Sequence, residues 1–434
     1  MNLITKIILE NRREGIPEDL IKREENVAEY FKLRPRKIVV ITGFRRVGKS
    51  YLCFQSMEKL DMDKVAYINF EDERLEGIRD IPQLLTSAIY EIKPEYLFLD
   101  EIQKVRKWSL WLRRFYDREK NRIQIVVTGS SSKLSSREIP TELRGRNLVL
   151  HLFPLSFGDF LSFKGKKIDI EAIEFSERER GNALALLKEY VQYGSMPEII
   201  NYPPRKKAET LREYLSLVVA RDIIERYKIR KPESVNALIK LLLNSQRITY
   251  SKLLNSMKSI GFSIGKETIL SYIEKIKSSY FFFEIPSIKP TVKELLRGER
   301  KVIIIDNGFI NFFSLKFSES IGRLMENLVG VRLIERSMNN PFFDVFFWKD
   351  HQQREVDFVL KEGSEVKQLI QVCYDPSDLE TKDRELKALV KASNQLNCKN
   401  LLVITWDHEA KEEFKGKKIK FTPLWKWLLV KNRT

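Results

Sequence analysis

Cysteine and histidine are scarce in this chain of 434 residues, which holds only three of each. The cysteines Cys53, Cys373 and Cys398 form no CxxC pair, so neither a disulfide framework nor a structural zinc site is indicated. The histidines are isolated from one another, which leaves metal centres and His-based catalytic triads poorly supplied. This usage fits a reduced compartment, and we expect a cytoplasmic protein.

Long hydrophobic runs are also missing. No stretch approaches the ~20 apolar residues that a membrane helix needs. The amino-terminal sequence MNLITKIILENRREG turns charged too soon for a signal peptide. We therefore expect a soluble chain with no membrane partner.

Acidic residues are outnumbered, because 60 Asp and Glu face 77 Lys and Arg for a net charge of +17. A protein this basic commonly meets an acidic partner, and nucleic acid, DNA in particular, is the first candidate. A lysine-rich solvated surface of a heat-adapted protein is the alternative. The length predicts two to four domains.

The first part of the chain alternates strand-like and helical segments. Short, almost wholly apolar runs at 37–42, 65–70, 96–100 and 123–129 read as buried strands. Helical patterns separate them, which predicts the α/β class with a parallel sheet.

The remainder divides into helical and mixed parts. Residues 153–228 are mostly helical in pattern, whereas 233–310 show three helical segments and two strand-like runs, typical of a winged helix. After 316 a helix precedes further strands, which predicts a second α/β unit. The expected domains are an amino-terminal helical segment (1–35), a parallel α/β domain (36–152), a helical domain (153–230), a winged helix (231–315) and a carboxyl-terminal α/β domain (316–434).

The sequence GFRRVGKS at 43–50 fits the phosphate-binding pattern GxxxxGK[ST], between an expected strand and an expected helix. Its glycines let the backbone approach a phosphate, its amides form an anion-binding nest, and Lys49 can reach the β- and γ-phosphates of ATP. The Ser50 hydroxyl can ligate Mg²⁺. The expected nucleotide-binding residues are Gly43, Phe44, Arg45, Arg46, Val47, Gly48, Lys49, Ser50 and Tyr51.

Two carboxylates end the run YLFLDEIQ at 96–103. Because ligands bind at the carboxyl ends of parallel strands, Asp100 is expected to hold Mg²⁺ and Glu101 to act as general base on the attacking water. Used alone, such acids could equally cap a helix.

Three further residues are candidates for contact with the γ-phosphate. Ser130 follows the strand at 123–129 and could touch the phosphate or the water, although an ordinary serine-rich loop would look the same. Arg144 or Arg146, in LRGRNL, could serve as an arginine finger for a neighbouring subunit, which would imply a homo-oligomer. Plain surface arginines remain the alternative.

At this point the chain resembles archaeal and bacterial AAA+-type ATPases that join a P-loop domain to a restriction-endonuclease-like domain of unassigned function. The resemblance rests on GFRRVGKS, YLFLDEIQKV, VVTGSSS with LRGR, LFPLSFGDFL, YGSMPEII, RDIIERY and REVDFVL. It covers nearly the whole chain and implies ATP hydrolysis with Mg²⁺, a helical lid and a winged helix. That group commonly has proline where Phe44 stands. The resemblance favours Arg146 over Arg144 as the finger.

The restriction-endonuclease fold uses a helix acid, a strand Asp and an acid-x-Lys strand. Glu326 and Asp357 match the first two, with Glu355 on the face of Asp357, but the third reads Gln371-Val372-Cys373. We therefore expect a degenerate site with weak or no nuclease activity. Lys382, Lys387 and Lys391 are candidates to supply the missing cation, whereas Lys367 lies too far along its strand.

The expected winged helix is basic, which suggests contact with DNA phosphates. The overall prediction is an ATPase that couples its nucleotide cycle to DNA. An ATP-dependent switch that binds protein partners, and an ATP-regulated nuclease, are the alternatives. The expected phosphate contacts are Lys266, Lys275, Lys277, Lys289, Lys293, Arg297, Arg300 and Lys301.

Overall fold

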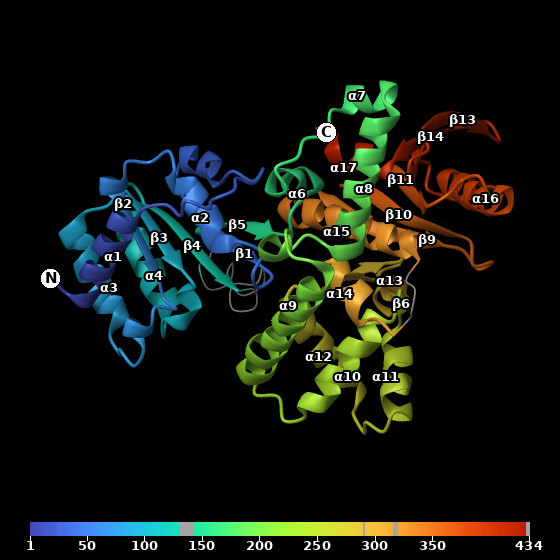
Figure 1. Cartoon of the computed structure of the whole chain (residues 1–434). Helices are drawn as coiled ribbons and strands as arrows, with labels where there is room; N and C mark the ends of the chain where they lie inside the picture. The colour runs from blue at the N-terminus through green and yellow to red at the C-terminus, as the bar shows by residue number, and fades with distance from the viewer. Residues whose placement is uncertain (131–142, 144, 290, 316–319, 431–434) are drawn as a thin grey trace. The chain divides into compact units, whose positions relative to one another are not determined.

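The computed structural model describes residues 1–130, 143, 145–289, 291–315 and 320–430 (Figure 1). It divides into two units, residues 1–153 and 154–434, and each is described by itself. None of the helices within these ranges is long and apolar enough to cross a membrane.

The first unit is built on a five-stranded sheet in the order β2-β3-β4-β1-β5, in which every neighbouring pair is parallel. All six residues of β1 are buried, as their continuous apolar and β-branched sequence predicts. The parallel α/β prediction is confirmed, and the edge strand β5 is an addition to the four expected strands. The strands are β1 (Ile38–Gly43), β2 (Val65–Asn69), β3 (Tyr96–Asp100), β4 (Gln124–Ser130) and β5 (Asn147–Leu152).

Among the described residues, four α-helices accompany this sheet. Apolar side chains of three of them form one buried cluster with the strands, and α1 packs beside β2 and α3 (Figure 1). Because the strands are parallel, their carboxyl ends lie along one edge, where β1 passes into α2. The helices are α1 (Leu3–Glu14), α2 (Lys49–Met57), α3 (Ile81–Ile92) and α4 (Trp108–Glu119).

The second unit begins with helices, as the sequence predicts for 153–228. Ser156 and Asp159 form a capping box that starts the first of them. The last continues into a π-helical segment, η6 (Val218–Glu225). The helices are α6 (Phe157–Phe163), α7 (Ile170–Phe175), α8 (Glu177–Tyr193) and α9 (Pro204–Leu217).

Three helices and a small antiparallel sheet follow, with strand order β6-β8-β7. The three helices and two of the strands match the expected segments, whereas β6 and α13 are additions. The elements are α10 (Pro232–Leu243), β6 (Arg247–Ile248), α11 (Tyr250–Ser259), α12 (Lys266–Ser278), β7 (Phe282–Pro286), α13 (Val292–Arg297), β8 (Arg300–Ile304) and α14 (Asn307–Phe313).

A six-stranded mixed sheet closes the second unit, in the order β13-β14-β12-β11-β10-β9. The long helix α15 packs against β8 of the small sheet and against β9 of the large one. Apolar residues on one side of α16 pack against β10 and β11. The elements are α15 (Ile321–Asn339), β9 (Phe343–Lys349), β10 (Glu355–Glu362), β11 (Glu365–Cys373), α16 (Leu379–Gln395), β12 (Leu401–Thr405), β13 (Ala410–Phe414), β14 (Lys417–Pro423) and α17 (Leu424–Leu429).

Candidate nucleotide site

The loop between β1 and α2 requires glycine at two positions. A Cβ atom on Gly43 would lie 2.2 Å from the carbonyl oxygen of Leu152, which is backbone and cannot move aside. Gly48, the N-cap of α2, has a φ of 95°, a conformation that side chains oppose. The loop is therefore shaped for close approach of its backbone to a ligand.

Cationic and amide groups converge inside this loop. The Lys49 Nζ donates to the carbonyl oxygens of Gly43 at 3.4 Å and Phe44 at 3.1 Å. Phe44 and Val47 are wholly buried and anchor the loop to the unit, whereas Arg46 and Tyr51 are exposed and Arg45 is half-buried. The Lys49 amine and the amino end of α2 suit the negatively charged triphosphate of a nucleotide.

Asp100, the last residue of β3, is completely buried beside the loop. The Tyr67 hydroxyl donates to its Oδ2 at 2.8 Å, and the Thr128 hydroxyl donates to its Oδ1. Burial raises the pKa of Asp100, and hydrogen bonds from Ser50 and Thr128 act in the opposite direction. The structure thus brings the Ser50 hydroxyl and the Asp100 carboxylate together, a set of oxygens that suits Mg²⁺.

Glu101 follows Asp100 at the carboxyl edge of the sheet, where the chain leaves β3. Its φ is 53°, which is uncommon for a residue with a side chain. The Glu101 amide donates to the Thr128 Oγ1 at 3.1 Å, and its carboxylate accepts from the Gln103 amide. One threonine therefore fixes both acids of the strand tip.

The residues expected near the γ-phosphate are only partly described. The backbone of Ser130 lies opposite Gly43 in the sheet, at the carboxyl edge, but its side chain is outside the described residues, as is Arg144. Arg146 binds both oxygens of Asp117, at 2.8 and 3.0 Å. It precedes β5 and lies at the amino edge of the sheet, a strand of six residues (~20 Å) from the loop of its own chain.

Sequence reasoning missed Arg23, which supports the loop from outside. Its buried guanidinium donates to the carbonyl oxygens of Val47 and Phe153, both at 2.8 Å, and pairs with Glu25. The Gln55 side chain holds the backbone of Arg23 against α2. No local pattern marks Arg23, because its partners lie 24 and 130 residues away.

Sequence reasoning also missed Thr128 and Tyr67. Both stand in buried apolar strands, and each could have been found as the polar group that interrupts such a strand near its carboxyl end.

A basic surface lies over α3 and α4. Its floor is Pro82 and Trp111, whose indole donates to the Thr86 hydroxyl at 2.9 Å. No cation on this surface forms an ion pair with any residue the structure describes, and Asp117 beside it is engaged by Arg146. We call it the basic face, and its cations are Arg79, Arg106, Lys107, Arg113, Arg114 and Arg118.

The three acids expected in the carboxyl-terminal domain do lie together. They surround Lys301, which was expected on the exposed wing. The Lys301 Nζ lies 2.6 Å from Glu326, 3.1 Å from Glu355 and 2.7 Å from Asp357. The side chain of Lys301 is 1% exposed. The expectation that Lys301 contacts DNA phosphates is wrong, because β8 directs this residue inward.

The lysines of α16 do not supply the cation, contrary to expectation. Lys382 pairs with Glu412 at 2.8 Å, and Lys391 pairs with Asp350 at 2.7 Å. Lys387 pairs with Asp383. Each is paired away from the acidic cluster.

The third element of the expected nuclease site contacts Asp357 through Gln371 and through the backbone amide of Val372, which donates to the Asp357 Oδ2 at 2.9 Å. The Gln371 Oε1 accepts from the Asp357 amide at 3.2 Å, and its amide group donates to Glu385. Cys373 is a buried free thiol whose pKa burial raises to about 11, so it remains neutral.

Other expected phosphate contacts are also occupied. Arg300 is buried, stacked 4.5 Å from the ring centroid of Tyr250, which corrects its assignment to an exposed wing. Lys277 pairs with Glu274 and Glu284, and Lys275 lies over two tyrosine rings. Lys266, Lys289 and Lys293 are exposed, and the Arg297 side chain is outside the described residues.

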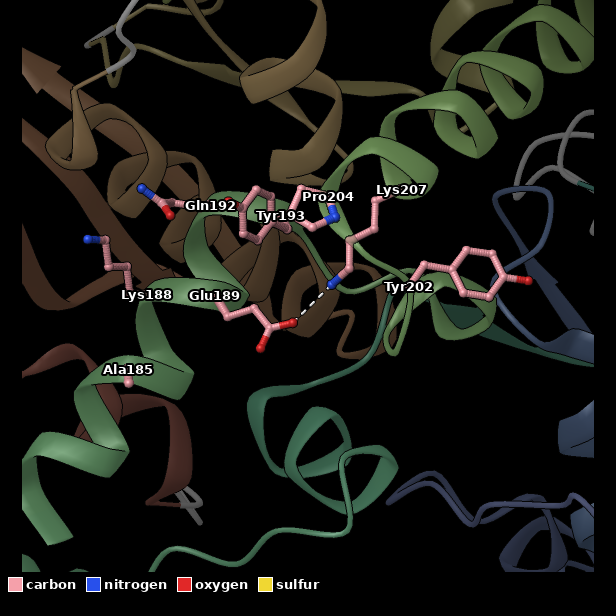
Figure 2. A pocket seen from close by; sticks show the side chains of 8 residues that line it. All are labelled: Ala185, Lys188, Glu189, Gln192, Tyr193, Tyr202, Pro204 and Lys207. Atoms are coloured by element: carbon pink, nitrogen blue, oxygen red, sulfur yellow. Dashed lines mark hydrogen bonds and ion pairs between the residues drawn. The ribbon is translucent and has the colours of Figure 1, made fainter.

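A pocket of about 340 Å³ opens between α8 and α9 (Figure 2). Figure 2 shows the Lys207 amine directed at Glu189, 3.0 Å away. Lys164 reaches the same carboxylate at 2.8 Å, and Lys207 also lies over the ring of Tyr193. Because the Glu189 carboxylate is already paired with two lysines, we assign the pocket no part in nucleotide chemistry.

Comparison with known proteins agrees with the geometry of the first unit. A family model described as an AAA domain matches residues 35–161, and two domains of unknown function, DUF8612 and DUF4143, match 184–320 and 321–427. The sheet order and the loop are those of a P-loop NTPase, and the fold expected from the sequence is thereby confirmed for this unit.

Two curated relatives are themselves uncharacterized. Protein MJ1544 of Methanocaldococcus jannaschii is 37% identical over 99% of this chain and 95% of its own length. A protein of Haemophilus influenzae is 25% identical over 82% of this chain and 87% of its own. Among solved structures, the Walker-type ATPase PABY2304 of Pyrococcus abyssi is 15% identical with a TM-score of 0.43, covering 69% of this chain and 97% of that one.

Proposed function

The chain belongs to the family of the archaeal protein MJ1544 and carries an AAA domain, and on this premise we propose that it is a magnesium-dependent ATPase coupled to nucleic acid. The observation that carries the proposal is the juxtaposition of Lys49, Ser50 and Asp100 at one edge of the sheet. An amine, a helix start and paired oxygen ligands suit ATP with its metal.

Each residue of the site has a role in this proposal. The loop amides and Lys49 hold the β- and γ-phosphates, while Ser50 and Asp100 hold Mg²⁺. The bound metal neutralises charge on the phosphates. Glu101 takes the proton of the attacking water, and Thr128 keeps both acids in place.

The test is the rate of ATP hydrolysis by the full chain and by Lys49→Ala. We expect the variant to lose at least about 100-fold in turnover, because it lacks the cation that stabilises the developing charge. Exposed Lys59→Ala is the control and should keep the native rate. Equal rates in Lys49→Ala and the native chain would contradict the proposal.

The basic face supports the nucleic-acid part of the proposal. Arginine forks suit phosphate oxygens, and cations without acidic partners lose no ion pair when they bind them. The exposed Lys266, Lys289 and Lys293 of the second unit add positive charge, in agreement with the net charge of +17. We assign 231–315 as a winged helix on the order of its helices and its small sheet.

Gel shifts at two salt concentrations test this part. Replacing Arg106, Arg114 and Arg118 by alanine should weaken DNA binding and reduce its salt slope by about 0.9 for each lost phosphate contact. The control, which removes the same charge elsewhere in the unit, is Arg13→Ala with Lys32→Ala and Lys59→Ala. Absence of DNA binding by the native chain would instead favour the protein-binding switch.

We propose that the carboxyl-terminal domain has the restriction-endonuclease-like fold and no nuclease activity. Gln371 and Cys373 replace the charged pair of such a site, and the acids are closed in by Lys301. Incubation with supercoiled plasmid and Mg²⁺ or Mn²⁺ should leave it uncut. Cleavage that Asp357→Ala abolishes would contradict this assignment.

A further inference from the structure

The ammonium group of Lys301 sits among three carboxylates that belong to a different part of the second unit. Glu326 lies on α15, whereas Glu355 and Asp357 lie on β10. An ammonium has three N–H donors, and three carboxylates lie within 3.1 Å of this one. The Lys301 Nζ also donates to the carbonyl oxygen of Asp357 at 3.2 Å, so its contacts are shared between the three carboxylates and that carbonyl.

Lys301 keeps its charge in spite of its burial. Burial alone would lower the pKa of Lys301, but Asp357, Glu326 and Glu355 together raise it above its usual value. The ammonium also lies 5.0 Å from the ring centroid of Phe358, whose face favours a cation. A permanent positive charge is thus fixed at this point.

The same oxygens would suit a divalent metal if the ammonium were absent. One carboxylate oxygen from each of the three acids lies within 4.8 Å of the others. Hard divalent cations prefer such oxygens, and most of this cluster is shielded from water. We propose that Lys301 is the resident cation of the cluster and takes the place of a divalent metal.

The surrounding structure fixes the backbone that carries Lys301. Its backbone is in the middle strand of the small sheet, paired with Arg247 on one side and Ile285 on the other. The Asn327 side chain of α15 exchanges two hydrogen bonds, each 2.8 Å, with the backbone of Ile304. These contacts hold the backbone of β8 beside α15.

A second cation reinforces the arrangement from the same small sheet. The guanidinium of Arg247 on β6 pairs with Glu355. Burial raises the pKa of Glu355 and of Glu326, and Lys301 opposes the increase in both. Loss of Lys301 would leave these acids without their principal counter-charge, which favours uptake of a proton or a metal.

The test measures Mn²⁺ binding by the full chain without nucleotide, using electron paramagnetic resonance. Native protein should bind no Mn²⁺ that depends on Asp357. Lys301→Ala should gain one equivalent, and Mn²⁺ should raise its melting temperature by several degrees. Lys301→Ala with Asp357→Asn is the matched control and should lose both gains.

Two results with the native chain and with Lys301→Ala would overturn the proposal. One is Mn²⁺ binding by the native chain that Asp357→Asn abolishes, which would show that the metal displaces Lys301. The other is a folded Lys301→Ala protein that binds no Mn²⁺. If Lys301→Ala fails to fold, Lys301→Met with Glu326→Gln, which also removes the excess negative charge, should fold. If the Lys301→Met, Glu326→Gln double variant also fails to fold, and the native chain binds no Mn²⁺, the proposal that Lys301 takes the place of a metal is contradicted.

The outcome is independent of the proposed ATPase and nucleic-acid functions, because no residue of the first unit enters the test. If the Mn²⁺ experiment contradicts the role of Lys301, the hydrolysis assay with Lys49→Ala still tests the ATPase. If the hydrolysis assay contradicts the ATPase, the Mn²⁺ experiment still tests Lys301.

Discussion

Glu101 combines an unusual backbone conformation with an acid at the sheet edge. Its left-handed φ costs of order 1–3 kcal/mol, and such strain gathers at functional positions. The Glu101 amide donates to the Thr128 hydroxyl, the Glu101 carboxylate accepts from Gln103, and these two bonds hold the residue in this state. The strain is consistent with an acid positioned for chemistry.

We expect Glu101→Gln to bind ATP normally and to hydrolyse it about 100-fold more slowly, because the amide cannot accept the proton of water. Calorimetry and a phosphate-release assay measure the two properties. The control is Glu76→Gln, an exposed acid in the same unit. A full hydrolysis rate in Glu101→Gln would exclude Glu101 as the general base.

His151 should make the first unit sensitive to acid. It is buried in β5, and burial lowers its pKa from 6.5 to about 4. Between pH 6.5 and 4 the unfolded chain therefore binds a proton that the folded chain refuses, so stability falls as the pH falls, by up to about 3 kcal/mol. Above pH 6.5 the effect is absent.

Thermal melting of His151→Gln across this pH range checks the effect. The melting temperature of the variant should fall less than that of the native chain between pH 6.5 and pH 4. An unchanged pH profile would show that His151 is not the sensitive group.

At the scale of elements, the phosphate loop depends on a segment that is neither helix nor strand. Residues 15–26 run along α2, where Tyr51 donates to Asp19 and Gln55 holds the backbone of Arg23. Arg23 then ties the loop at Val47 to the end of β5 at Phe153. The segment therefore acts as an external brace.

Arg23→Ala should destabilise the first unit by about 3 kcal/mol, because two buried carbonyl groups lose a charged donor. It should also weaken ATP binding, since the loop loses its support. Denaturant unfolding and calorimetry measure the two effects, with exposed Arg13→Ala as the matched control. Equal behaviour of the two variants would rule out the brace.

Strands that are nearly continuous apolar runs could be predicted from the sequence, including the edge strand β2, whereas β6 and β13 could not. β1, β3 and β4 are continuous apolar runs that need burial on both faces, and the expected ranges match them closely. In contrast, β13 at the edge of the large sheet has the charged sequence AKEEF, as befits an edge strand, and was not expected.

The candidate site shows the same division. Gly43, Lys49 and Ser50 are adjacent in sequence, so a local pattern identifies them. Lys301 meets Glu326 and Asp357 only through folding, 25 and 56 residues along the chain, and its own surroundings, RGERK, read as a solvated basic turn. Its inward direction is set by the pairing of β8 with β6 and β7.

At the scale of the whole molecule, the expected role of Arg146 as an arginine finger implies an assembly. It cannot reach the loop of its own chain, so a role as an arginine finger requires another copy. We therefore expect a homo-oligomer in which Arg146 exchanges Asp117 for the γ-phosphate of a neighbour.

Mixing two inactive variants tests this assembly. Arg146→Ala and Glu101→Gln should each hydrolyse ATP slowly, and their mixture should recover part of the native rate, because some interfaces then combine an intact finger with an intact base. Asp117→Asn controls for the lost ion pair, since it leaves Arg146 in place. No recovery in a mixture shown to exchange copies would contradict action between subunits.

The position of Lys301 among three carboxylates also constrains which domain rearrangements this family can tolerate during evolution. The lysine and its acids fall on opposite sides of the junction between the two domains of unknown function, at residues 320 and 321. A gene rearrangement that cuts at that junction would leave the buried Lys301 ammonium in one product and the three carboxylates in the other, each without its counter-charge. The two halves are therefore expected to be inherited together, as a single heritable module.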